Sequence, residues 1–149
     1  MLNSDFKEFA GWLNANGVEY LVVGGYALAA HGHPRYTGDI DFWISPESLN
    51  IERVLDALRD FGFGSLGLSN KDFTADTVIQ LGHPPRRIDL LTGIDGVAFA
   101  DCWARRETLQ ADGLTLHLIA LEDFKANKRA AGRLKDLADL QALEPDGRV

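Results

Sequence analysis

Cysteine is almost absent from this sequence, and long apolar runs are missing altogether. The 149 residues contain one cysteine, Cys102, so the chain cannot form an internal disulfide, which is typical of a reducing cytoplasm. No apolar run reaches the roughly 18 residues that a membrane span requires. Residues 1–5 lack a basic segment followed by an apolar one, so no signal peptide is expected. We therefore expect a cytoplasmic protein with no membrane segment and with Cys102 as a buried structural thiol.

Positive charge is also scarce. The sequence has 15 lysines and arginines against 22 aspartates and glutamates, which gives a net charge of −7. Such a balance disfavours non-specific binding to nucleic acid, because that binding depends on cations that neutralise phosphates. The exception is a basic cluster near the C-terminus, formed by Lys125, Lys128, Arg129, Arg133 and Lys135. A local basic patch on an acidic protein suits a site for one anionic ligand.

The length and the apolar content of 46% predict one globular domain over residues 1–149, with a sizeable core. Apolar spacing and turn residues predict alternating helices and strands. The helix after residue 44 is expected to start at Ser45-Pro46-Glu47 and to bury Leu49. Helices are expected over 4–16, 25–32, 99–105, 121–131 and 134–143, and strands over 19–23, 39–44, 77–81, 87–91 and 108–119, the last folded as a hairpin. The fold class is therefore α/β or α+β, with a mixed β-sheet flanked by helices.

A glycine turn joins the strand over 19–23 to the helix that follows it. Gly24 and Gly25 would let the backbone approach a phosphate closely, and the start of the next helix presents free N–H groups. An ordinary tight turn explains two glycines equally well. No Gly-Lys-Ser/Thr follows them and they do not begin a G-x-G-x-x-G, so the turn is neither a P-loop nor a dinucleotide fingerprint.

Two carboxylates follow on the next strand. Alternation along residues 39–44 places Asp39 and Asp41 on one side, with Ile40 and Phe42 on the other. Two like charges so close together repel, which favours a cation between them. Mg²⁺ binds a few carboxylates together with substrate phosphates, so the glycine turn and the acid pair together favour a metal site over a solvated acidic edge.

A lone acid, Asp89, interrupts the apolar strand over 87–91. A carboxylate there is costly unless a metal or a cation meets it. The simpler interpretation is an ion pair with Arg86 or Arg87, and Asp76 is the substitute candidate on the neighbouring strand. Near a metal, Asp89 is suited to act as the base on an attacking hydroxyl.

Three stretches of this sequence resemble a known superfamily. They are GGYALAAHGHPRYTGDIDFWI, RRIDLLTG and KRAAGRLKDLADLQAL. Together they resemble the DNA polymerase beta-type nucleotidyltransferases and, more narrowly, small bacterial nucleotidyltransferases of the abortive-infection toxin type. The superfamily pattern is an apolar strand, Gly-Gly or Gly-Ser, a helix, then Asp-x-Asp, with a third Asp on a later strand. The resemblance covers most of the chain between Tyr20 and Leu143 and implies the nucleotidyltransferase fold.

The resemblance also implies roles for particular acids. Asp39 and Asp41 would bind the divalent metal, Mg²⁺ or Mn²⁺, with Asp89 as the third ligand and as the catalytic base. An in-line displacement on a phosphate requires such a metal site, cations for the developing charge and a base for the nucleophile.

Contacts to the nucleotide are implied at other positions. Gly24 and Gly25 would hold the triphosphate, with Gly25 standing where many relatives have serine. Arg35 and Thr37, in an Arg-x-Thr-x-Asp pattern, would touch phosphate or ribose, and Lys128 would contact the nucleotide phosphates. In the simpler interpretation the basic cluster is a solvated face, whose cations Arg133 and Lys135 pair with Asp136 and Asp139.

The expected function is that of a metal-dependent nucleotidyltransferase that transfers a nucleoside monophosphate from an NTP to an acceptor hydroxyl. The acceptor could be RNA, a protein side chain or a small molecule. The resemblance to toxins adds a role in a toxin–antitoxin system, with a separate antitoxin protein as partner. The alternative is a non-catalytic nucleotide-binding or antitoxin-like module on the same fold, and a drug-modifying enzyme is a third hypothesis.

Overall fold

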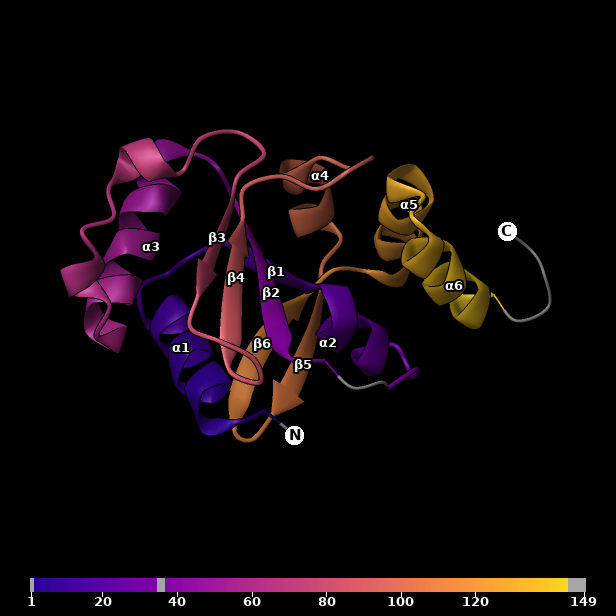
Figure 1. Cartoon of the computed structure of the whole chain (residues 1–149), viewed down its shortest axis with the longest axis horizontal. Coiled ribbons are helices and arrows are strands. Elements are labelled where there is room, and N and C mark those ends of the chain that lie inside the picture. The colour runs from indigo at the N-terminus through magenta and orange to yellow at the C-terminus, as the bar shows by residue number, and fades with distance from the viewer. Residues whose placement is uncertain (1, 35–36, 145–149) are drawn as a thin grey trace.

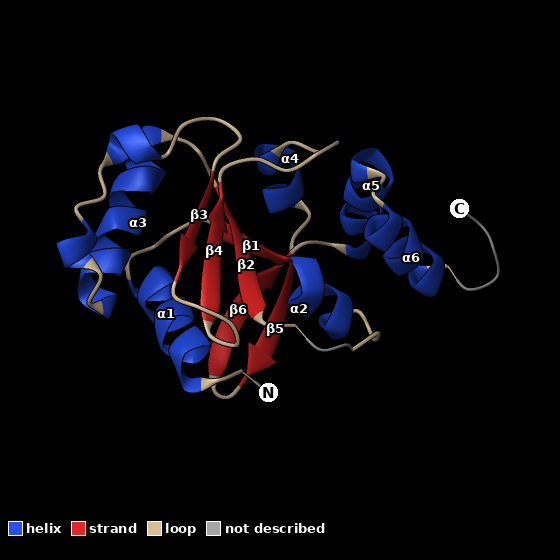
Figure 2. Ribbon diagram, in the orientation of Figure 1, coloured by secondary structure: helices blue, strands red, loops and turns tan. Residues whose placement is uncertain are grey.

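A six-stranded mixed sheet runs through the centre of the computed structural model, which describes residues 2–34 and 37–144 (Figure 1 and Figure 2). The strand order is β3-β4-β2-β1-β6-β5. At its centre β2 runs parallel to β4 and antiparallel to β1, while β1 runs parallel to β6. The outer pairs, β3–β4 and β5–β6, are antiparallel hairpins. The strands are β1 (Tyr20–Val23), β2 (Asp39–Ile44), β3 (Val78–Leu81), β4 (Arg87–Leu91), β5 (Glu107–Ala111) and β6 (Leu114–Leu118).

Helices surround this sheet. Figure 1 shows α1 and α3 beside one edge of the molecule and the pair α5 and α6 beside the other, with α4 between them. The helices are α1 (Ser4–Ala15), α2 (Gly24–Ala30), α3 (Ser48–Phe61), α4 (Phe99–Ala104), α5 (Leu121–Ala131) and α6 (Leu134–Leu143), with 3₁₀ turns at η1 (Gly64–Leu66) and η2 (Asn70–Asp72). None of these helices is both long enough and apolar enough to cross a membrane.

The two faces of the sheet differ in what they pack against. The ring of Phe42 contacts Phe9 of α1 at a centroid distance of 5.6 Å and Tyr20 at 5.4 Å. The next residue, Trp43, contacts Phe99 of α4 at 5.1 Å. Because successive side chains of a strand alternate, Asp41 lies on the side of Trp43, away from α1.

The predicted mixed sheet with flanking helices is confirmed. The bounds of β2, β4, α5 and α6 match the expected ranges, and α1 buries the four apolar residues at helical spacing, Phe6, Phe9, Ala10 and Leu13. Cys102 is fully buried, and burial followed by the charge of Asp123 raises the pKa of its thiol to about 11. The thiol is therefore a structural group, as expected.

The predicted start of α3, with Ser45 as the cap and Pro46 as the first helical residue, is wrong by two residues. Ser45, the residue after β2, is still hydrogen-bonded to the neighbouring chain segment, because its N–H donates to Glu19 O at 3.2 Å. The side chain of Asn50 reinforces this, since it donates to Ser45 O at 3.0 Å and accepts from Glu19 N at 2.8 Å. The helix consequently begins at Ser48, and Leu49 is 64% exposed instead of buried. Ile51 is the core residue of this first turn.

Candidate functional site

Three carboxylates converge where β2 and β4 lie side by side. Asp41 is the register partner of Asp89, and Asp39 is the register partner of Arg87. Since β2 and β4 are parallel and neighbouring, residues in register point to the same face of the sheet. One carboxylate oxygen from each of Asp39, Asp41 and Asp89 lies within 4.8 Å of the others. Asp76, the substitute candidate, does not belong to this cluster.

Arg87 bridges two of the three carboxylates. Its Nη2 donates to Asp39 Oδ2 at 2.8 Å and to Asp89 Oδ2 at 3.0 Å, and its Nε donates to Asp89 Oδ1 at 2.9 Å. The fork of the guanidinium therefore grips Asp89 with two parallel bonds. The ion pair considered as an alternative for Asp89 is present, and it coexists with the carboxylate cluster. The other arginine considered, Arg86, pairs with Asp5 at 3.1 Å instead.

The pKa values of the three acids are shifted in different directions. Burial, followed by the charges of Asp39 and Asp89, raises the pKa of Asp41 to about 8. Burial also raises the pKa of Asp89, against the opposing hydrogen bond from Arg87. In Asp39 burial is outweighed by hydrogen bonding to Asp89, Thr37 and Arg87, which holds its pKa below the usual range. No cationic side chain pairs with Asp41 in residues 2–34 and 37–144, so its negative charge is the least compensated of the three.

The donor set fits a divalent cation. Three hard oxygen donors gathered on one face of the sheet are the ligands that Mg²⁺ and Mn²⁺ prefer. The raised pKa of Asp41 marks a site where a further positive charge is electrostatically favoured. Asp39, Asp41 and Asp89 are therefore the residues that would hold such an ion.

The glycine turn packs directly against this cluster. Gly24 has a positive φ of 69°, and a Cβ on it would collide with Asp41 Oδ2. A Cβ on Gly25 would come within 3.0 Å of the Thr37 side chain. Thr37 Oγ1 in turn donates to Asp39 Oδ1 and to Asp39 O, both at 3.0 Å. Both glycines are thus required for packing around the acids, whatever else they contact.

The first turn of α2 also lacks a side-chain cap. Its N-cap residue is Val23, which has no side chain that could accept from the helix N–H groups. Gly24 and Gly25 line a cleft of about 710 Å³ that also contains Asp39, Asp41 and Asp89. Uncapped N–H groups at the edge of a cleft are open to a ligand that accepts hydrogen bonds.

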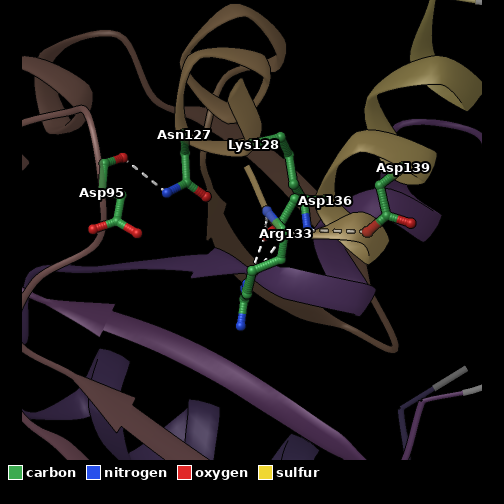
Figure 3. A network of polar contacts seen from close by, with 6 residues as sticks. All are labelled: Asp95, Asn127, Lys128, Arg133, Asp136 and Asp139. Carbon is green, nitrogen blue, oxygen red and sulfur yellow. Dashed lines mark hydrogen bonds and ion pairs between the residues drawn. The ribbon is translucent and has the colours of Figure 1, made fainter. Parts of the chain in front are cut away.

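The opposite wall of this cleft comes from α5 and α6, with Asn127, Lys128, Arg133 and Lys135 among its lining residues. Lys128 is buried, and its Nζ contacts Asp136 Oδ1 at 3.2 Å and Asp139 Oδ2 at 3.0 Å (Figure 3). The expected ion pair between Arg133 and Asp136 is present, with Nε and Oδ2 2.6 Å apart. The structure therefore brings all the described candidates to one cleft, while Arg35 lies outside the described residues.

Sequence reasoning missed the bridging role of Arg87 and the cleft-facing positions of Arg133 and Lys135. The signal for Arg87 was available, because it stands two residues before Asp89 on the same strand and so shares its face. For Arg133 and Lys135 the basic cluster indicated an anionic ligand, but which of its cations line the cleft depends on how α6 packs against α5.

Comparisons with known proteins identify the family and the fold. Residues 3–146 match the model of a protein family described as "Nucleotidyl transferase of unknown function (DUF2204)". No curated protein matches the chain at a significant level.

Two solved structures share the fold. One is a Thermotoga maritima protein proposed to be a nucleotidyltransferase, with a TM-score of 0.62 and 16% identity, covering 98% of this chain and 96% of its own. The other is an antigenic nucleotidyltransferase-like protein from Paracoccidioides brasiliensis, with a TM-score of 0.55 and 19% identity, covering 97% of this chain and 78% of its own. At these identities the likeness establishes the fold.

Proposed function

Because this chain belongs to the family of nucleotidyl transferases of unknown function whose model spans nearly all of it, we propose that it is an active, metal-dependent nucleotidyltransferase. It would transfer a nucleoside monophosphate from an NTP to an acceptor hydroxyl and release pyrophosphate. The observation that carries this proposal is the convergence of Asp39, Asp41 and Asp89 within 4.8 Å at one end of a cleft. A module that only binds nucleotides does not need three converging acids.

The proposed cofactor is Mg²⁺ or Mn²⁺, held by the three aspartates. When bound, such an ion neutralises phosphate oxygens and orients the triphosphate. Asp89 is proposed to accept the proton of the attacking hydroxyl. Its raised pKa supports this role, because a carboxylate with a higher pKa is a better base near neutral pH. Arg87 keeps the Asp89 carboxylate in a fixed orientation by gripping both of its oxygens.

The nucleotide is proposed to lie along the cleft. The backbone N–H groups of Gly24 and Gly25 would donate to its phosphates, which their open position at the uncapped start of α2 supports. Thr37 and Arg35 remain proposed contacts to phosphate or ribose. Lys128 is proposed to act on the phosphates as well, either by direct contact or through its neighbours.

Nucleotidyl transfer is tested with two labels. The protein is incubated with each NTP in turn, carrying ³²P at either the α or the γ position, together with Mg²⁺ or Mn²⁺ and total cell extract. We expect label from the α position alone to appear in an acceptor. The rate of transfer by an Asp41→Asn variant should be about 10²- to 10⁴-fold lower than that of the wild type. Asp101→Asn, an exposed aspartate of α4, is the matched control. NTP binding without transfer to any acceptor would favour the non-catalytic module instead.

A toxin role is a separate proposal that rests on the sequence resemblance. It predicts that induced expression of the chain arrests bacterial growth, while expression of an Asp39→Asn/Asp41→Asn variant does not. Equal growth of the two strains at equal expression would contradict the toxin role and leave the enzymatic proposal intact.

A further inference from the structure

A buried lysine lies between two carboxylates beside the cleft. The side chain of Lys128 is 6% exposed, and those of Asp136 and Asp139 are 1% and 9% exposed. Two of the three N–H donors of the ammonium group bind these acids. The nitrogen also lies 5.2 Å from the centre of the Phe124 ring. Charges this deeply buried are tolerated only when they are paired.

Arg133 is a second cation of this network, and it contacts Asp136. Asp136 Oδ2 accepts from Arg133 Nε at 2.6 Å and from the Arg133 backbone N–H at 3.3 Å, which caps the start of α6. Lys128 thus contacts both Asp136 and Asp139, and Arg133 contacts Asp136. Figure 3 shows how these four side chains meet between α5 and α6.

This network reverses the usual orientation of a surface helix. The acids of α6 face α5, while Leu134 and Leu137 are 87% and 46% exposed. Surface helices ordinarily place their apolar residues inward and their charges outward. The contact of Lys128 with Asp136 and Asp139 is therefore a main determinant of how α6 lies on α5, together with the buried Leu140.

The orientation of α6 decides which cations reach the cleft. Arg133 and Lys135 both line it. The Arg133 side chain is 66% exposed in spite of its contact with Asp136. Lys135 is exposed, and it forms no hydrogen bond or ion pair with any other described residue. These two side chains can therefore meet an anionic ligand without breaking a buried pair.

The second half of α5 is fixed to the loop that follows β4. Asn127 Nδ2 donates to Asp95 O at 2.9 Å (Figure 3). Gly96, with a φ of 82°, packs so closely that a Cβ on it would collide with Ala130 of α5. The loop after β4, which follows Asp89 along the chain, thereby holds α5 in place beside the cleft.

We propose that Lys135 and Arg133 are the residues that contact the polyphosphate of a bound nucleoside triphosphate. Lys128 is a positioning residue that presents them through Asp136 and Asp139. This inference rests on the proposed function, since it assigns the phosphate contacts of the same cleft. It opposes the direct interpretation in which the ammonium of Lys128 itself meets the phosphates.

A double substitution separates the two roles of Lys128. Lys128→Gln alone removes a cation that contacts two buried carboxylates, so we expect a lower Tm. Lys128→Gln/Asp139→Asn removes one charge of each sign and keeps groups that can hydrogen-bond to Asp136. If Lys128 only positions α6, the double variant recovers most of the lost Tm and binds its ligand with a Kd within about threefold of the wild type.

The ligand-contact role is tested at Lys135. The probes are Mg²⁺–NTP and Mg²⁺–tripolyphosphate, with Kd measured by calorimetry and Tm measured in parallel. We expect Lys135→Gln to raise both Kd values about tenfold at an unchanged Tm, and Arg133→Gln to raise them at a reduced Tm. Arg129→Gln is the matched control, because Arg129 lies on α5, next to Lys128 in the sequence, but pairs with Glu144 and does not line the cleft.

The outcomes distinguish this inference from the proposed function. Wild-type affinity in Lys135→Gln and Arg133→Gln, with about tenfold weaker binding in the double variant at restored Tm, would overturn the inference while nucleotidyl transfer could stand. Tripolyphosphate binding that depends on Lys135, without nucleotidyl transfer to any acceptor, would support the inference and contradict the proposed function. Failure of the wild type to bind either probe would contradict both.

Discussion

Asp41 lies directly opposite Asp89 in the parallel pairing of β2 and β4, and no cation in the described part of the chain pairs with Asp41. Arg87 neutralises Asp39 and Asp89 from one side of the cluster. Three carboxylates thus share one guanidinium, and the excess negative charge is unfavourable for the isolated protein and favourable for binding a divalent ion.

Removing the charge of Asp41 should therefore stabilise the metal-free protein. We expect Asp41→Asn to raise the free energy of unfolding by about 1–3 kcal/mol at pH 9 in the presence of EDTA, because it relieves repulsion from two neighbouring carboxylates. The same variant should lose the Tm increase that Mg²⁺ gives the wild type. Denaturant unfolding with and without Mg²⁺ measures both effects, and a destabilised Asp41→Asn protein in EDTA would contradict the prediction.

The pH dependence of stability follows from the same residue. The pKa of Asp41 is raised from its ordinary value of 3.8 to about 8 in the folded chain. Between pH 3.8 and pH 8 the Asp41 carboxyl is protonated in the folded state and ionised in the unfolded state. The free energy of unfolding therefore falls as the pH rises towards 8. We expect the Tm of the metal-free wild type to decline relative to Asp41→Asn from pH 6 to pH 9. Mg²⁺ should bind more tightly across the same rise in pH, with release of a proton detectable by calorimetry in two buffers of different ionisation enthalpy.

Arg87 is expected to act through the carboxylates that it orients. Arg87→Lys keeps the charge but loses the fork that grips Asp89, so kcat should fall about tenfold or more while the Tm changes little. Arg86→Lys is a close control, because the side chain of Arg86 makes exposed contacts with Asp5 and Ser4 and none with the three carboxylates. Steady-state kinetics on the two variants make the comparison, and equal kcat values would show that the fork is not needed.

Gly24 is expected to be irreplaceable for a reason beyond its backbone. Gly24→Ala adds strain at a φ of 69° and pushes a methyl group into the Asp41 carboxylate. Gly113→Ala adds similar strain at a φ of 78° where a Cβ meets open space. Both variants should lose about 1–2 kcal/mol of stability, but only Gly24→Ala should lose the Mg²⁺-dependent Tm increase. Retention of that increase in Gly24→Ala would contradict the role of this close packing.

Acid should weaken the contact between α5 and α6. Burial works to raise the pKa of Asp136, but hydrogen bonds from Arg133 and Lys128 outweigh it and hold the pKa below its usual range. A lowered pKa contributes stability above about pH 4 that is lost as pH falls through the folded value. Asp136→Asn should therefore be less stable than the wild type at pH 7, by about 2–3 kcal/mol, and this difference should shrink below pH 4. A difference that does not depend on pH would show that the charge of Asp136 contributes nothing.

The elements of this fold were largely predictable because local signals agree with the tertiary structure. Alternation placed Asp39 and Asp41 on one face of β2, and the glycine turn marked the start of α2. The end of β2 was different. Ser45-Pro46 has the chemistry of a helix start, but the hydrogen bonds that Ser45 and Asn50 make to Glu19 hold this segment beside the neighbouring chain segment. That competition comes from a residue distant in sequence.

The site was predictable as a set of residues but not as an arrangement. The register of Asp41 with Asp89 depends on β4 lying beside β2. The two residues are far apart in the sequence, and no local pattern between them specifies this pairing. In α6, Asp136 and Asp139 follow the spacing of a solvated polar face, yet the structure turns them inward. Both acids contact Lys128 on α5, and no pattern within α6 reveals that contact.

The most direct test is a crystal structure of the protein with Mn²⁺ and a non-hydrolysable NTP analogue, recorded with Mn anomalous scattering. The proposed site predicts an anomalous peak coordinated by Asp39, Asp41 and Asp89, with the triphosphate extending along the cleft towards Arg133 and Lys135. A structure in which Mn²⁺ and nucleotide bind away from these three carboxylates would contradict it.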